Sequence, residues 1–127
     1  MSLSRLPDAK LAIMQVIWNI GSEVTSARVM ERLAGKKDWA TTTVLNFLAR
    51  LVDRKFLNVR REGKINHYTP MVSESEYLAV ESRSFLQRLH DNSFASLVAS
   101  LYGGKAVPQT DLDELQQFIN AKTGEQL

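Results

Sequence analysis

Polar side chains that could read the edges of DNA bases recur along one stretch of the chain at helical spacing. Thr42, Asn46 and Arg50 lie four residues apart, and Asp53 extends the series. Residues three or four apart share one face of an α-helix, so these groups would point the same way. Arg can hold guanine, Asn can hold adenine, and Thr can meet a thymine methyl group or a phosphate. This stripe, flanked by Thr43, indicates a helix that lies in the major groove.

The same stretch opens with three threonines, Thr41 to Thr43. Thr is a good N-cap, and we expect Thr41 to cap a helix that runs from Thr42 to about Lys55. The free N–H groups and the dipole at a helix start favour a phosphate. In helix-turn-helix proteins the first turns of the recognition helix reach the bases. A solvated helix face with a Thr cap is the plain alternative, so the neighbouring features decide between the two interpretations.

Two short runs that alternate apolar and polar residues follow this helix, LNVRR at 57–61 and INHYT at 65–69. A Gly-containing connection, EGK at 62–64, joins them, which is typical of a β-hairpin. The hairpin tip and its approach carry three cations: Arg60, Arg61 and Lys64. Such cations could hold the DNA backbone or enter the minor groove, although charged hairpin turns also occur on proteins that bind no DNA.

The charges divide the chain into a basic and an acidic part. Residues 1–70 hold 12 Lys and Arg against 6 Asp and Glu, whereas residues 71–127 hold 4 against 8. The net charge of +2 over 127 residues hides this difference. A basic first part is typical of a surface that meets a polyanion such as double-stranded DNA.

Two further helices precede the helix that carries the polar stripe. Pro7 marks the start of the first and Gly21 its end, and the second begins at Thr25 or Ser26. The third helix is expected to bury an apolar stripe at 3 and 4 spacing: Val44, Leu45, Leu48, Leu51 and Val52. Three helices and a hairpin predict a mainly α-helical fold with a small β-hairpin wing, a winged helix-turn-helix domain over residues 1–72.

Residues 73–127 are expected to form a segment of three more helices. Ser73 and Glu76 have capping-box spacing at its start, and the later helices should begin near Phe94 and at Thr110. Their apolar residues are too many for so small a segment to bury alone, so we expect a second copy to cover them in a homodimer. The residues expected at this dimer interface are Leu78, Phe85, Leu89, Leu97, Leu101, Leu115, Phe118 and Ile119.

The residue types that enzymes and metal sites need are missing or scattered. The chain has no Cys and only two His, which excludes thiolate ligands and Cys nucleophiles. Neither a Gly-rich phosphate loop nor a GxSxG elbow is present, so we expect no catalytic residue, no metal and no cofactor. No signal-peptide pattern and no apolar run of about 18 residues is seen, which predicts a cytoplasmic protein with no membrane insertion.

With these residues in view, the chain resembles the penicillinase repressor family of bacterial winged-helix regulators, the BlaI/MecI/CopY type. The resemblance covers almost the whole chain, and its most specific stretch is WATTTVLNFLARLVDRKFL at 39–57. The other matching stretches are LPDAKLAIMQVIW at 6–18, REGKINHYTP at 61–70 and FLQRLHDNSFASLVASL at 85–101.

The resemblance implies a homodimeric repressor that binds an inverted-repeat operator and dimerises through its C-terminal helices. It places four residues on the recognition helix and two in the wing: Thr42, Thr43, Asn46, Arg50, Arg61 and Lys64. Some members are inactivated when a membrane sensor triggers cleavage in the penultimate helix, which implies a sensor-linked protease as a further partner. This chain has Ser100-Leu101 where the best-known cases are cut at Asn-Phe, and it lacks the C-terminal Cys cluster of the copper-responsive members.

One alternative function stays open on the residues alone. A winged-helix domain could serve only as a protein–protein interaction module, with its basic face on an acidic partner and no specific DNA readout. Salt-sensitive binding to random duplex DNA would separate this alternative from a repressor, because phosphate contacts release counterions.

Overall fold

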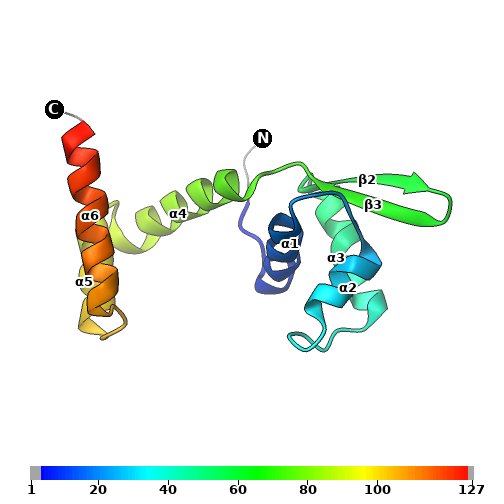
Figure 1. Ribbon diagram of the computed structural model, residues 1–127, viewed down its shortest axis with the longest axis horizontal. Helices are drawn as coiled ribbons and strands as arrows, with labels where there is room; N and C mark the ends of the chain where they lie inside the picture. The colour runs from blue at the N-terminus through cyan, green and yellow to red at the C-terminus, as the bar shows by residue number, and fades with distance from the viewer. Residues whose placement is uncertain (1–3, 126–127) are drawn as a thin grey trace. The chain divides into compact units, whose positions relative to one another are not determined.

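A computed structural model describes residues 4–125 and divides the chain into two compact units, Met1–Ser82 and Arg83–Leu127. Unit 1 contains α1 (Asp8–Ile20), β1 (Val24–Thr25), α2 (Ser26–Leu33), α3 (Thr41–Asp53), β2 (Leu57–Glu62), β3 (Ile65–Pro70) and the first half of α4 (Glu74–His90). Unit 2 contains the rest of α4, α5 (Phe94–Gly103) and α6 (Gln109–Glu125). The predicted winged-helix fold with C-terminal helices is confirmed (Figure 1).

The core of unit 1 forms where α1, α2 and α3 pack against the sheet. Each helix buries residues at helical spacing, such as Ile13 and Ile17 of α1 and Val44, Leu48 and Leu51 of α3. Fully burying one such side chain stabilises the fold by roughly 1.5–3 kcal/mol. The prediction that Leu45 shares this buried face is wrong, because its side chain is 40% exposed.

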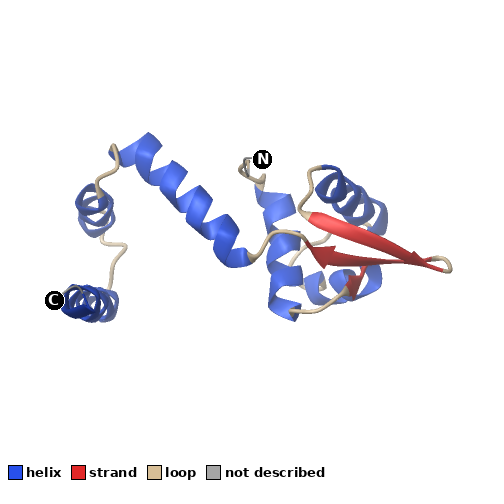
Figure 2. Cartoon of the chain, turned by 90° about the horizontal axis from the view of Figure 1, so that it is seen from above, coloured by secondary structure: helices blue, strands red, loops and turns tan. Residues whose placement is uncertain are grey.

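The three strands form one antiparallel sheet in the order β1-β3-β2 (Figure 2). The predicted hairpin is confirmed, and its register pairs Arg60 with His67 and Glu62 with Ile65. The turn is therefore Gly63-Lys64, and Gly63 has a φ of 62°, which a residue without a side chain adopts at little cost. β1 was not predicted, because two residues are too few to show an alternating pattern.

The helix starts show which capping predictions hold. The Thr25 hydroxyl accepts a hydrogen bond from the Arg28 N–H at 3.2 Å, so Thr25 is the N-cap of α2, which begins at Ser26 within the predicted start. At the start of α4 the Glu76 N–H donates to Ser73 Oγ at 3.1 Å. The Ser73 N–H donates back to Glu76 Oε1 at 3.3 Å, which completes the capping box. Thr41 is not the cap of α3, however, since Ala40 occupies that position without a side-chain hydrogen bond and Thr41 is the first helical residue.

Unit 1 extends beyond residue 72 because the first turns of α4 pack on the three-helix core. Tyr77 is buried, and its hydroxyl accepts a hydrogen bond from the Leu6 N–H at 2.8 Å. The Tyr77 ring also lies 5.7 Å from the ring of Trp18, centroid to centroid. The compact unit therefore ends at Ser82, and the expected division at 72/73 falls inside it.

Unit 2 contains helices with almost no interior. Neither α5 nor α6 buries a side chain fully among the described residues. α5 is capped by Ser93, whose hydroxyl accepts from the Ser96 N–H at 3.0 Å, and α6 begins one residue before the predicted Thr110. The apolar residues of this unit are thus available to a partner.

Candidate nucleic-acid interface

The exposed face of α3 carries the predicted polar stripe. Thr42, Asn46 and Arg50 are all exposed, because they lie opposite the buried row of α3. Thr41 is exposed beside them in the first turn, whereas Thr43 is half-buried. Within the described part of the chain, the side chains of Asn46 and Arg50 have no hydrogen-bond or ion-pair partner. They are therefore free to bind a ligand.

A recess of about 410 Å³ brings α3 together with two other elements. It is lined by the start of α2 with its N-cap, by Leu45 of α3, and by the turn and β3 of the hairpin: Thr25, Ser26, Ala27, Leu45, Lys64, Ile65, Asn66 and Tyr68. Leu45 is exposed because it faces this recess. This position of Leu45 was not predicted, since an apolar residue beside a buried stripe gives no signal that it faces solvent.

The wing separates its three cations. Lys64 lies exposed in the turn, and the exposed Arg61 donates from Nε to the carbonyl of Gly63 at 3.0 Å. Arg60 points to the opposite face of the hairpin, because successive strand residues alternate between faces. Arg60 and Arg61 therefore face different ways, and the expected contact of Arg60 with DNA stays a prediction.

Arg60 is held by two carboxylates. Its Nη2 lies 2.7 Å and its Nε 3.3 Å from the two oxygens of Glu23, and its Nη1 lies 2.9 Å from Glu62 Oε2. His67 lies beside both, with ring nitrogens 3.6 Å from Glu23 and 3.8 Å from Glu62. The Arg60 guanidinium lowers the pKa of Glu23 and of Glu62, because it donates hydrogen bonds to both carboxylates and lies beside them as a positive charge. Glu23 was not predicted, because only the sheet brings it near a residue 37 positions away.

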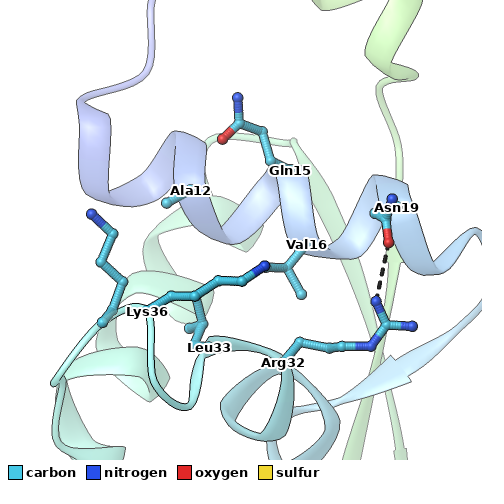
Figure 3. A pocket seen from close by; sticks show the side chains of 8 residues that line it. Ala12, Gln15, Val16, Asn19, Arg32, Leu33 and Lys36 are labelled. Atoms are coloured by element: carbon cyan, nitrogen blue, oxygen red, sulfur yellow. Dashed lines mark hydrogen bonds between the residues drawn. The ribbon is translucent and has the colours of Figure 1, made fainter.

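Another recess, which several cations line and which has a volume of about 350 Å³, lies between α1 and the end of α2 (Figure 3). Asn19 of α1 accepts a hydrogen bond from Arg32 Nη1 across it at 3.0 Å, and Lys36 and Lys37 also line it. Lys37 lies 5.7 Å from the ring centroid of Trp39, which itself packs edge-on against Phe47 at 5.4 Å. These cations add to the positive charge of unit 1.

Comparison with known proteins identifies the chain. The family model for penicillinase repressors matches residues 6–121. The chain belongs to the penicillinase repressor family. The penicillinase repressor of Bacillus licheniformis is 31% identical over 117 residues, which cover 92% of this chain and 91% of that protein. The methicillin resistance regulatory protein MecI of Staphylococcus aureus is 25% identical over 117 residues, 92% of this chain and 94% of MecI.

Two solved structures resemble more than half of this chain. The solution structure of the DNA-binding domain of the repressor BlaI has a TM-score of 0.53 at 33% identity, covering 60% of this chain and 92% of that one. The monomeric form of Bacillus licheniformis BlaI in complex with the blaP half-operator has a TM-score of 0.51 at 33% identity, with the same coverage. These likenesses confirm the winged-helix domain that the sequence predicted.

Family membership decides the function class. The chain is a winged-helix DNA-binding transcriptional repressor of the BlaI/MecI type, as predicted, and not an enzyme. This finding counts against the alternative of a module used only for protein–protein contact. Between residues 4 and 125 no group of His, Asp and Glu is arranged to hold a metal ion, and no helix is long and apolar enough to cross a membrane.

Proposed function

We propose that this repressor binds an inverted-repeat operator in the cytoplasm as a homodimer, with α3 of each subunit in a major groove. The observation that carries the proposal is the exposed stripe of Thr42, Asn46 and Arg50, whose amide and guanidinium groups have no partner within the described chain. A bidentate Arg or Asn contact distinguishes one base pair from another. The complex of the related BlaI with a half-operator supports one subunit per half-site.

The threonines at the start of α3 would orient the helix on the DNA backbone. Thr41 and Thr42 lie in the first turn, where the N–H groups without helical partners favour a phosphate. Thr43, which is half-buried, would contribute mainly its N–H group. On the far side of the recess, Arg61 and Lys64 of the wing would contact phosphates or the minor groove.

The apolar surface of unit 2 supports the proposed homodimer. Its Phe85, Leu89, Leu101, Phe118 and Ile119 are all exposed, with Leu89 at 61% and Phe118 at 60%, while Leu97 and Leu115 are half-buried. Leu78, which is also exposed, lies on the part of α4 that belongs to unit 1. A monomer rarely leaves so many large apolar side chains in water, and a two-fold interface would cover the same patch on both subunits. A dimer would also present two recognition helices about 34 Å apart, one turn of DNA.

A sensor-linked protease is a further proposed partner, through the family resemblance. Ser100 and Leu101 lie exposed near the end of α5, and cleavage there would detach α6 from the rest of the chain. Fragment masses of the tagged repressor from induced cells test this. A fragment ending at Ser100 supports cleavage, and an intact chain under induction contradicts it.

Substitution on α3 tests the proposed recognition face. Asn46→Ala and Arg50→Ala should each weaken binding to a duplex selected from a random pool by ~1–3 kcal/mol and relax the base preference at particular positions. Gln15→Ala, an exposed change on α1, should leave both quantities unchanged. If both α3 variants fold normally and keep wild-type affinity and preference, the reading helix lies elsewhere.

A further inference from the structure

The wing leaves the three-stranded sheet at one pair of residues. β1 pairs with β3 only at Tyr68 and His67, and His67 in turn pairs with Arg60 of β2. Beyond this pair the hairpin continues as two strands alone, through two more residue pairs to the Gly63-Lys64 turn. The hairpin reaches past the helices of unit 1 in both views (Figures 1 and 2). Two strands with no third neighbour hold their direction weakly.

A network of ion pairs, called the brace below, spans the residue pair at which the hairpin leaves the three-stranded sheet. Arg60 holds both carboxylate oxygens of Glu23 at 2.7 and 3.3 Å and also reaches Glu62, two residue pairs nearer the tip, at 2.9 Å. Glu23 belongs to the short connection between α1 and β1, so its position is set by the helical body. The brace therefore connects the helical body of unit 1 to the hairpin on both sides of the residue pair at which the hairpin leaves the sheet. Bidentate Arg–carboxylate pairs in a network are the surface ion pairs whose geometry matters most.

We propose that Glu23 is a positioning residue: through Arg60 it fixes the direction in which the hairpin leaves the sheet, and it thereby places Arg61 and Lys64 against DNA. The inference rests on the proposed wing contact. In this role Arg60 binds Glu23 and Glu62 and does not contact a phosphate.

The sign of one substitution separates this role from simple electrostatics. Glu23 is a carboxylate in the part of the chain that meets DNA, so removing its charge alone would strengthen binding to the polyanion. If Glu23 positions the wing, its removal weakens binding instead. Arg60→Lys changes the other partner of the ion pair without changing the net charge. Lys keeps the positive charge but lacks the planar guanidinium group that binds two carboxylates.

The test measures affinity for a random-sequence DNA duplex, by titration at low salt, with the full-length chain. We expect Glu23→Gln and Arg60→Lys each to weaken binding roughly threefold to fivefold. Glu31→Gln is the matched control, because Glu31 pairs with Arg28 within α2 at 2.9 Å and takes no part in the brace. It should leave affinity unchanged or slightly raised.

A cycle with Lys64→Ala shows whether Glu23 acts through the wing. Lys64→Ala should weaken binding less in the Glu23→Gln background than in the wild type, because a displaced wing no longer delivers Lys64. If Lys64→Ala weakens the wild type while Glu23→Gln binds as well as Glu31→Gln, the wing contact stands and the positioning role is overturned. If Lys64→Ala has no effect in the wild type, the wing contact fails, and the role of Glu23 fails with it.

Discussion

Arg60 and Arg61 are adjacent arginines of β2 that have different partners. Pleating sends their side chains to opposite faces of the hairpin. Arg60 meets Glu23 and Glu62, whereas the side chain of Arg61 donates a hydrogen bond to the carbonyl of Gly63 and stays exposed. Composition predicts a basic wing, but it cannot assign each cation to a partner, because the decisive carboxylate of Glu23 arrives from a distant part of the chain.

The Tyr77 hydroxyl group is one of the contacts that hold the start of α4 on the winged-helix core. Tyr77 Oη is the acceptor for the buried Leu6 N–H at 2.8 Å, so Tyr77→Phe leaves that donor without a partner. We expect the free energy of unfolding to fall by about 1–3 kcal/mol. Urea unfolding followed by tryptophan fluorescence measures it, since Trp18 lies beside Tyr77.

Tyr102→Phe is the matched control, because the Tyr102 side chain is 62% exposed in unit 2. It should leave the unfolding free energy unchanged. Equal stabilities of the Tyr77 and Tyr102 variants would show that the hydrogen bond to Leu6 is not part of what holds α4 on unit 1.

The elements could be predicted from the sequence wherever side chains carry local signals. Ser73 with Glu76, Thr25, Gly21 and the alternation within the hairpin each mark a boundary that the structure confirms. The elements that were missed depend on tertiary contacts. β1 exists because β3 lies beside it, and α3 begins one residue early because its N-cap position needs only an extended backbone, which Ala40 adopts.

The polar stripe of the candidate interface could be predicted, because it also depends on a local signal. A polar stripe at helical spacing gave Thr42, Asn46 and Arg50, since periodicity is a local property. The exposure of Leu45 was not predictable, because it depends on how α2, α3 and the wing lie around one recess. The pairing of Arg60 was not predictable either, because it depends on the sheet that brings Glu23 beside it.

The wing as an element is expected to contribute affinity without sequence preference. Lys64→Ala should weaken binding to a selected operator and to random duplex about equally, and should make the salt dependence shallower by about one unit. Titrations over a range of salt concentrations measure both. Lys105→Ala, in unit 2, is the control and should not change the slope. A loss of affinity confined to the operator would show that Lys64 reads bases.

At the scale of the whole molecule, the two units differ in what they bury. Unit 1 holds every fully buried apolar residue among residues 4–125, whereas α5 and α6 hold none. Unit 1 therefore has the core it needs to fold alone, as the solved DNA-binding domain of BlaI does. Unit 2 exposes Leu89, Phe118 and their neighbours, which a second subunit would cover.

The measurement that tests the central claim most directly is sedimentation of the full-length chain, compared with a fragment that ends at Ser82, each alone and with a duplex carrying an inverted repeat. The fragment must extend to Ser82 so that Tyr77 stays in place. We predict that the full chain is a dimer at micromolar concentration and binds the duplex as two subunits, while the fragment is a monomer that binds weakly. A monomeric full chain, or a fragment that remains dimeric, would contradict the account of how this repressor assembles on DNA.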